Sequence, residues 1–515
     1  MAARRHAVYS VVLALVLISL VALLLRLIGL GSKDLWQDEG TSIYYAQLPL
    51  HTLYWSLCDP HPPGYYLALR VALALGRSEW WIRLPSALGG VLAVLLTYVQ
   101  ARVVLHPLPN ATPRRVTHAA LLAAGLVAVS PLHVWYSQEA RPYALLSALA
   151  LAMTASGTWW WLRPRLARAL VYLLASWLAL SLEYGALAAW ALLNLLLLRG
   201  WPWGNQAHRS DRMSRKTRNW LMLQGLVIAP FAIWWLRSAQ GAALARPSYH
   251  AVFLAVQASA AGLGLTPERG QWVVGGALAL AVAAGLIGAL VVRRSPVVRS
   301  WLGSPWVGVL LAALLLLLAV WGMAPRLYTV KRHLVVLLPF VAIAAAWALT
   351  SPAVKRPHLA RGITAGLLLV CLVLSLATVL LVPKSAWREA VHTLASEAQP
   401  GDAIWVDEMS APVFGYYWQD RLPWQPLLAG ELEALNSTPA AERVWVVGDV
   451  SPYRDIMAML PTQFAATRVV TEQFDLPGLV LRAYDTGVPA ESVPAPAEAL
   501  LWGLTLPSPL EIDCH

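Results

Sequence analysis

Residues 8–30, VYSVVLALVLISLVALLLRLIGL, decide the class of fold, because they form one long apolar stretch after Arg4 and Arg5. A helix that crosses a bilayer needs about 20 such residues. A signal peptide is the alternative, but this apolar core is too long for one and no small-x-small cleavage site follows it. We therefore expect an uncleaved first membrane helix.

The rest of the chain repeats this pattern. Of the 515 residues, 58% are hydrophobic and 13% are charged, whereas soluble proteins carry about 25% charged residues. This excludes a soluble enzyme and a disordered chain, and it predicts about eleven spans. After the first they are residues 84–105, 118–132, 143–162, 169–182, 186–198, 220–236, 272–292, 306–323, 334–349 and 363–382.

The charges predict the orientation of these spans. Residues 1–383 hold 32 Lys and Arg against 9 Asp and Glu, and residues 384–515 hold 7 against 18. The basic residues gather on alternate loops, as the positive-inside rule requires when the N-terminus is inside. An odd number of spans then places the tail outside the cytoplasm. The excess of positive charge belongs to these loops, so we expect no nucleic-acid partner.

We expect three regions. Residues 1–383 form the membrane domain, with a long first outer loop at 31–83. Residues 384–487 form a small extracytoplasmic α/β domain, a lid or acceptor platform, and residues 488–515 form a loosely ordered tail. Within the α/β domain, helices are expected at 387–398, 411–418 and 453–460, and strands at 403–406, 443–447 and 479–484. The scattered Cys58, Cys371 and Cys514 indicate no disulfide framework and no metal knuckle.

The first outer loop carries an acidic pair, Asp38-Glu39, and a later polar run from Asp59 to Tyr66 that includes His61-Pro62-Pro63. Adjacent carboxylates beyond a membrane span can supply a general base and a neighbour that places the acceptor. The alternative is a helix start, where acids complement the positive end of the helix dipole.

Two further polar clusters follow. The second outer loop reads Ser137-Gln138-Glu139-Ala140-Arg141-Pro142-Tyr143, which fits either a site or a structural Glu139–Arg141 pair. Lys331-Arg332-His333 lies at the outer end of a later span, and adjacent cations suit a phosphate better than a neutral sugar. Its alternative is snorkelling at the interface. Together the clusters describe a site that holds a phosphate leaving group and deprotonates a nucleophile.

At these residues the sequence resembles the GT-C glycosyltransferases, in the polyprenyl-phosphate-sugar branch with protein O-mannosyltransferases and lipid A aminoarabinose transferases. The resemblance covers about the first 340 residues. Its motifs, in order, are Leu25-Arg26 leading to Trp36-Gln37-Asp38-Glu39, His61-Pro62-Pro63-Gly64-Tyr65-Tyr66, Ser137 to Tyr143, and Arg332-His333-Leu334 to Pro339. His333 replaces the usual Tyr, and Glu183-Tyr184 stands where relatives often carry His-Tyr, so the role of Glu183 is open.

The resemblance implies an inverting transfer of a sugar from a polyprenyl-phosphate donor to a hydroxyl on a lipid, protein or glycan, with membrane lipids around the enzyme. Asp38 would be the general base and Glu39 its helper. The donor phosphate would contact His61, Arg141, Lys331 and Arg332, with Arg332 first. Glu139, Asp59, Tyr65, Tyr66 and Gln138 would bind or orient the acceptor.

No cofactor is required by this scheme. A divalent metal is an open alternative, with Asp38, Glu39, His61 and Glu139 as the candidate ligands.

Two other functions compete with this interpretation. A lipid-linked-sugar transporter or flippase would explain many spans. Such proteins usually carry internal repeats or broken helices near the midplane, whereas this sequence shows no internal repeat and its charges lie at the outer rim. An oligosaccharyltransferase with a lipid-pyrophosphate donor would carry a Trp-Trp-Asp motif, and the runs Trp80-Trp81 and Trp159-Trp160-Trp161 lack the Asp.

Overall fold

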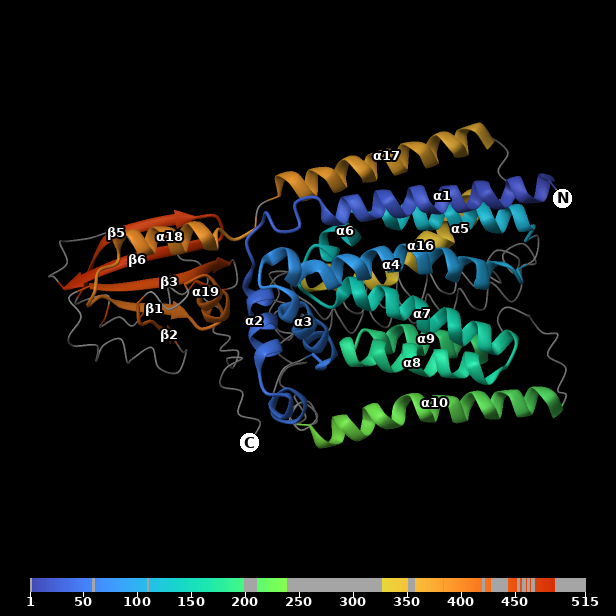
Figure 1. Ribbon diagram of the computed structural model, residues 1–515, viewed down its shortest axis with the longest axis horizontal. Coiled ribbons are helices and arrows are strands. Elements are labelled where there is room, and N and C mark those ends of the chain that lie inside the picture. Colours follow the sequence, from blue (N-terminus) through green and yellow to red (C-terminus); the bar gives the residue numbers. More distant parts are fainter. Residues whose placement is uncertain are drawn as a thin grey trace, which may run out of the picture. The chain divides into compact units, whose positions relative to one another are not determined.

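The computed structural model divides the chain into two compact units (Figure 1). The helical unit comprises Met1–Ile28, Pro60–Tyr65 and Arg83–Leu380, and the sheet unit comprises Gly29–Asp59, Tyr66–Ile82 and Leu381–His515. The structure describes residues 2–57, 61–108, 111–198, 211–238, 327–350, 357–382, 384–418, 422–427, 443–451, 454–455, 460, 464 and 468–486.

The helical unit contains apolar helices of different lengths that pack side by side. They are α1 (Ala2–Leu27), α4 (Glu79–Leu105), α5 (Pro113–Ala128), α6 (Pro131–Ser137), α7 (Tyr143–Leu162), α8 (Leu166–Leu182), α9 (Ala186–Leu198), α10 (Asp211–Arg237), α16 (Leu327–Leu349) and α17 (Pro357–Leu381). Helix α7 packs on α8, α9 and α16, and α5 packs on α1 and α16 (Figure 1).

Small side chains allow the close packing of α5 and α16. The buried face of α5 carries Ala119, Ala120, Ala123 and Ala124, which meet small and branched residues of α16 such as Ile343. Small residues let membrane helices approach closely, and the contacts then come from dispersion between well-fitted surfaces.

The helices follow the apolar stretches of the sequence. Residues 143–162 and 186–198 are helical as predicted, and the other predicted spans in the described part, apart from 118–132, are helical with shifted ends. Five described helices are long and apolar enough to cross a membrane, or six if the bent pair α5–α6 is one span. The predicted spans 272–292 and 306–323 lie outside the described residues.

One predicted span, 118–132, is not a single helix. Helix α5 ends at Ala128, and α6 begins after Ser130 at an angle of 58° to it. The hydroxyl of Ser130 accepts from the N–H of His133 at 3.4 Å, and Pro131 occupies the first position of α6. Proline has no N–H and favours the first helical turn, so the sequence restarts the helix here.

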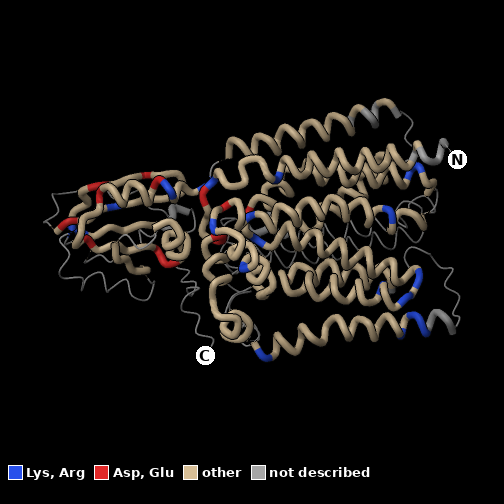
Figure 2. Tube along the Cα trace, in the orientation of Figure 1, with Lys and Arg blue, Asp and Glu red and all other residues tan. Residues whose placement is uncertain are grey.

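Many of the basic residues of the helical unit lie at one end of its helices. Figure 2 shows a group of Lys and Arg at the end of the bundle where the N-terminus lies, and others at the opposite end. The first group includes the α7–α8 connection with Arg163 and Arg165 and the start of α10 with Arg215 and Arg218. The distribution matches the charge pattern that predicts this end to be cytoplasmic.

The sheet unit combines segments from both ends of the chain. Its first part contains α2 (Gln37–Gln47), a short π-helix (Thr52–Ser56) and most of α3 (Gly64–Leu75). Its second part contains α18 (Trp387–Glu397), β1 (Ala403–Asp407), α19 (Ala411–Trp418), β2 (Gln425–Leu427), β3 (Arg443–Ser451), β4 (Arg454–Asp455), β5 (Arg468–Leu476) and β6 (Leu479–Thr486).

The sheet has the order β2-β1-β3-β6-β5, with β4 beside β3. Strands β1, β2 and β3 are parallel, while β6 is antiparallel to β3 and β5. Alternate residues such as Trp405, Val446 and Val480 form the core of one face. Helix α18 contacts β6 and α19 contacts β1 (Figure 1).

Two local expectations for this region need correction. The stretch 453–460 is predicted as helix, but Arg454–Asp455 is a strand whose residues pair with Val450 and Ser451 of β3. Strand β5 is not among the predicted strands, because only one of its residues is fully buried and it carries charges instead of an apolar run.

Candidate functional site

The acidic pair lies in the first turn of α2, in the sheet unit. Asp38 is half-buried and Glu39 is fully buried. Glu39 closes a capping box, since its Oε2 accepts from the backbone N–H of Trp36 at 3.3 Å. The same oxygen lies 3.1 Å from Nζ of Lys384. Asp38 and Glu39 therefore share a helix start, and the carboxylate of Glu39 stabilises that start.

The segment from His61 to Tyr65 belongs to the helical unit and packs tightly there. A Cβ on Gly64 would lie 2.5 Å from the carbonyl oxygen of Ser181, so glycine allows this approach to the end of α8. The hydroxyl of Tyr65 lies 3.0 Å from Oγ of Ser86, which donates to the carbonyl of Arg141 at 2.8 Å. This chain of contacts connects the His61–Tyr65 segment to the motif from Ser137 to Tyr143.

The motif from Ser137 to Tyr143 is buried and begins at the end of α6. Glu139 and Arg141 are 2% and 4% exposed, and the N–H of Arg141 donates to the carbonyl of Glu139 at 2.8 Å. The amide of Gln138 donates to the carbonyls of Leu25 and Ile28 at 3.1 and 2.8 Å. Gln138 thus caps the C-terminal end of α1, where carbonyls have no partner within the helix.

The His61–Tyr65 segment and the motif from Ser137 to Tyr143 meet at His61. Nη2 of Arg141 lies 3.3 Å from Nε2 of His61, and this nitrogen lies 3.5 Å from Oε2 of Glu183. Arg141 also contacts the hydroxyl of Tyr143 at 3.4 Å. A guanidinium, an imidazole and a carboxylate from three separate stretches therefore form one cluster, which we call the Arg141–His61–Glu183 cluster. Such a set can bind an anion while a carboxylate balances its charge.

Glu183 is the residue of this cluster whose role the sequence leaves open. It lies at the end of α8, is 5% exposed, and precedes the turn to α9. An acid between two apolar helices is costly unless it has a function or a partner. That cost is the sequence signal by which Glu183 can be found.

Arg26, another buried cation, positions the motif from Ser137 to Tyr143. This residue of α1 donates from Nη1 to the carbonyl of Ala128 at 3.0 Å and from Nη2 to that of Val127 at 3.3 Å. These carbonyls end α5 at the bend. Nη2 also lies 3.0 Å from Nδ1 of His133 on α6. Arg26 therefore stabilises the bend that aims α6 and the residues after it.

The remaining predicted site residues are placed less completely. Asp59 lies outside the described residues. Lys331 and Arg332 belong to the N-terminal part of α16, where the structure describes the helix and not these side chains. Tyr66 is buried in the sheet unit with its ring edge against Tyr45, at a centroid separation of 5.4 Å.

The metal candidates are divided between the two units. Asp38 and Glu39 belong to the sheet unit, and His61 and Glu139 to the helical unit. Among the described residues, no group of three or more His, Cys, Asp or Glu is placed to hold a metal ion.

No protein-family model matches the chain, and no curated protein matches it in sequence. Its fold does have relatives among solved structures. ArnT from Cupriavidus metallidurans bound to undecaprenyl phosphate is 15% identical with a TM-score of 0.52, over 91% of this chain and 97% of that one.

Two weaker likenesses are the Archaeoglobus fulgidus oligosaccharyltransferase in the apo form and the S. cerevisiae protein O-mannosyltransferase Pmt1-Pmt2 complex bound to the sugar donor. The first is 14% identical with a TM-score of 0.49, over 91% of this chain and 74% of that one. The second is 18% identical with a TM-score of 0.33, over 44% and 33%. The ArnT likeness extends over nearly the whole of both chains, and the chain has the GT-C fold.

Proposed function

We propose that this protein is a membrane glycosyltransferase that moves a sugar from a polyprenyl-phosphate donor to a hydroxyl acceptor, with inversion at the anomeric carbon. The observation that carries the proposal is the buried Arg141–His61–Glu183 cluster in a protein with the GT-C fold. The ordered motifs of the sequence and the acidic turn at Asp38 support it. The undecaprenyl phosphate bound to the ArnT relative supports a polyprenyl phosphate as the lipid.

The reaction needs one base and several phosphate ligands. Asp38 takes the proton of the acceptor hydroxyl, and the acceptor oxygen forms a bond to the anomeric carbon from the side opposite the phosphate. The bond between that carbon and the phosphate oxygen breaks, and its electron pair leaves on polyprenyl phosphate. Fixed cations at the leaving phosphate lower the barrier, because they stabilise charge that grows in the transition state.

We assign the donor phosphate to Arg141, His61, Lys331 and Arg332, with Arg332 the main contact. Glu139, Asp59 and Tyr65 bind or orient the acceptor. Guanidinium groups suit this role because their planar donors match phosphate oxygens in pairs. Glu183 holds His61 in place and balances the charge of Arg141.

The protein acts, in this proposal, as a multi-pass protein of the plasma or inner membrane, with its site on the extracytoplasmic face. The acceptor is a lipid, a protein or a glycan. No cofactor is required; addition of EDTA or of Mg²⁺ to the purified enzyme tests this, and a loss of transfer with EDTA would contradict it.

The proposal is tested by transfer with the purified full chain in detergent. The protein receives a mixture of polyprenyl-phosphate sugars and a generic hydroxyl acceptor, and the release of polyprenyl phosphate is measured. Asp38→Asn removes the base, so we expect transfer to be abolished while donor binding is largely kept. Arg332→Ala should weaken donor binding and turnover together. Glu397→Gln, at the exposed end of α18, is the control.

Three outcomes would contradict the proposal. Full activity of Asp38→Asn would overturn the base. Donor binding without turnover, across several acceptors, would indicate a carrier or flippase. Turnover with lipid-pyrophosphate donors alone would indicate chemistry of the oligosaccharyltransferase type.

A further inference from the structure

Lys384 makes a buried ion pair with the acidic turn. It follows the last described membrane helix, α17, and its side chain is 6% exposed while that of Glu39 is 0% exposed. One oxygen of Glu39 receives both Lys384 and the N–H of Trp36. The contact therefore joins the chain after α17 to the first turn of α2, which also carries Asp38. Whatever fixes Glu39 fixes the backbone of the proposed base.

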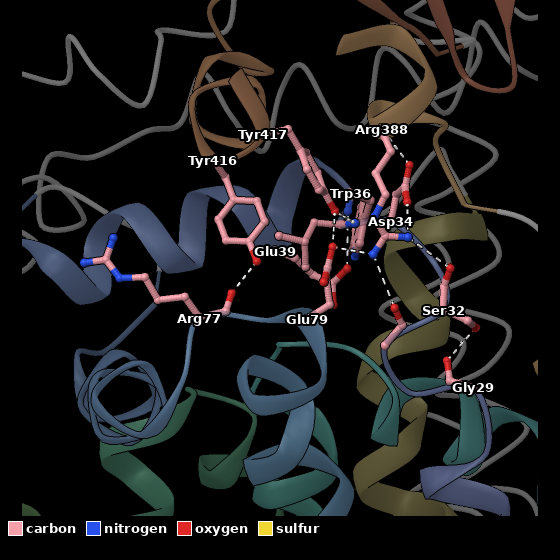
Figure 3. Close-up of polar contacts among 12 residues, drawn as sticks. Gly29, Ser32, Asp34, Trp36, Glu39, Arg77, Glu79, Arg388, Tyr416 and Tyr417 are labelled. Carbon is pink, nitrogen blue, oxygen red and sulfur yellow. Dashed lines mark hydrogen bonds and ion pairs between the residues drawn. The ribbon is translucent and has the colours of Figure 1, made fainter. Parts of the chain in front are cut away.

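Arg388 of α18 strengthens the same connection (Figure 3). Its Nη1 lies 2.8 Å from Oδ1 of Asp34, and its backbone N–H donates to the other oxygen of Asp34 at 2.8 Å. Its guanidinium also donates to Glu79 and to the carbonyls of Ser32 and Gly31. One cation thus holds together the two ends of the first outer loop.

Helix α19 adds two tyrosines to this arrangement. The hydroxyl of Tyr417 accepts from the N–H of Leu35 at 2.9 Å and donates to Glu79 at 2.9 Å, and the hydroxyl of Tyr416 donates to the carbonyl of Arg77 (Figure 3). Burial raises the pKa of Tyr417, so its hydroxyl keeps the proton that it donates.

Helix α19 also packs directly on α2. A Cβ on Gly40 would lie 2.6 Å from Cβ of Val413 and 2.7 Å from the backbone of that residue. Only a glycine allows the helices to approach this closely. The acidic turn is therefore held on one side by α19 and at its carboxylate by Lys384.

We infer that Lys384 is a positioning residue for catalysis: it holds Glu39, and with it the first turn of α2, so that Asp38 is presented as the base. The inference rests on the proposed function and deepens it. It assigns to the C-terminal region a part in building the catalytic turn, in addition to any role as a lid or acceptor platform. It also assigns Glu39 to positioning instead of acceptor binding.

The physical cost of losing Lys384 makes the inference testable. Removing one partner of a buried pair leaves the other as an uncompensated buried charge, whereas removing both leaves none. Lys384→Met should therefore disturb both the stability and the position of α2. The double variant Glu39→Gln/Lys384→Met should restore stability but still lack the ionic contact that holds the turn.

The experiment compares these variants with Lys384→Arg, which keeps the charge, and with the control Arg443→Met, which removes a cation from a partly exposed ion pair of the sheet. Two quantities are measured in the full chain in detergent: kcat with donor KM, and the hydrogen exchange of residues 36–47. We expect Lys384→Met and the double variant to lower kcat about 10- to 100-fold, as misplacement of a catalytic group does. Donor KM should change little, and exchange in residues 36–47 should become faster.

Lys384→Arg should recover most of kcat, and Arg443→Met should behave like wild type. Wild-type kcat and exchange in Lys384→Met would overturn the inference, and so would full recovery in the double variant, because the pair would then serve charge balance alone. If the wild type shows no transfer, the proposed function fails, and the exchange measurement still decides whether Lys384 holds α2.

Discussion

His61 has two neighbours that compete for one nitrogen. Its Nε2 accepts from Arg141 when it carries no proton, and it donates to Glu183 when it carries one. The distances of 3.3 and 3.5 Å leave both contacts available. Glu183 holds the imidazole of His61 beside the guanidinium of Arg141, so that both groups lie ready for the proposed donor phosphate. In the proposed mechanism, the carboxylate of Glu183 orders these two groups before the donor binds.

This argument predicts that Glu183→Gln raises donor KM about tenfold, since a hydrogen bond to a charged group contributes about 1.5–3 kcal/mol. Steady-state kinetics with varied donor measures the effect. The variant His61→Asn and the double variant complete a mutant cycle. Because the two residues act through each other, the losses should be less than additive. Strictly additive losses would show that Glu183 does not act through His61.

The buried hydroxyl of Tyr417 leads to a second prediction: the folded protein should lose stability at alkaline pH. Burial raises its pKa well above the ordinary 10.0, and the charges of Glu79 and Asp34 raise it further. Above about pH 10 the unfolded chain loses this proton and the folded chain keeps it, so the free energy of unfolding falls as pH rises. The slope for this one group is at most about 1.4 kcal/mol per pH unit.

The measurement is the unfolding temperature in detergent between about pH 8 and pH 11. Tyr417→Phe should start lower, because it loses two hydrogen bonds, but fall less over this range than wild type. Tyr44→Phe, at an exposed position of α2, should fall as wild type does. An equal fall in Tyr417→Phe would contradict the prediction.

At the residue scale, sequence predicts which residue types gather but not what each one contacts. The acidic pair has two interpretations in the sequence, a site or a helix start, and the structure shows that Glu39 does form a helix start. Its partner Lys384 is 345 residues away, and nothing local to either residue indicates the pair. Gln138 likewise caps α1 through a contact that no motif reveals.

At the scale of elements, the contact of α2 with α19 depends on one glycine. Replacing a glycine inside a helix with alanine normally stabilises the helix by up to about 1 kcal/mol. At Gly40 the new Cβ would lie 2.7 Å from the backbone of Val413, which cannot move aside as a flexible side chain can. The sign of the effect should therefore reverse, with a cost of about 1–3 kcal/mol for overpacking.

The prediction is that Gly40→Ala lowers the unfolding temperature and slows transfer, because the first turn of α2 moves with the helix. Gly225→Ala is the matched control: it is also a helical glycine, and its Cβ would meet nothing within 4 Å. It should be neutral or stabilising. If Gly40→Ala behaved like this control, the close packing of α2 on α19 would be refuted.

Helices could be predicted better than strands in this chain. A membrane helix satisfies all its backbone groups internally, so a long apolar run is enough to indicate it. The ends of α7 and α9 follow from this rule alone. Strand β5 reads RVVTEQFDL, and it is stabilised by pairing with β6 instead of by its own apolar content. The bend after α5 has a visible cause in Ser130-Pro131, but a span count by hydropathy passes over it.

At the scale of the whole molecule, the sequence does not show which distant segments form one unit. Residues Gly29–Asp59 and Tyr66–Ile82 group with the C-terminal sheet through contacts such as Asp34 with Arg388, which lie 354 residues apart. Charge patterning, by contrast, is a property of the whole chain. It predicts the orientation without any knowledge of these contacts, and Figure 2 shows many of the basic residues of the helical unit at the end of its helices where the N-terminus lies.

The predicted orientation leads to a prediction about whether the number of membrane spans between two positions is odd or even. Seven predicted spans lie between Arg165, on an expected inner loop, and Ser396, in α18. An odd number places these residues on opposite sides of the membrane, with Ser396 outside. Both side chains are exposed, so a cysteine at either position should react with a thiol reagent that reaches it.

The measurement uses a chain without Cys58, Cys371 and Cys514, carrying either Arg165→Cys or Ser396→Cys, in right-side-out vesicles. A membrane-impermeant maleimide should label Ser396→Cys at once and Arg165→Cys only after the membrane is permeabilised. The reverse pattern would invert the orientation and place the acidic turn of Asp38 in the cytoplasm. Labelling of both from outside would mean an even number of spans between them, and one of the predicted spans would then not cross. Each pattern of labelling therefore corresponds to a different topology, and the polyprenyl-phosphate mechanism on the outer face requires the first.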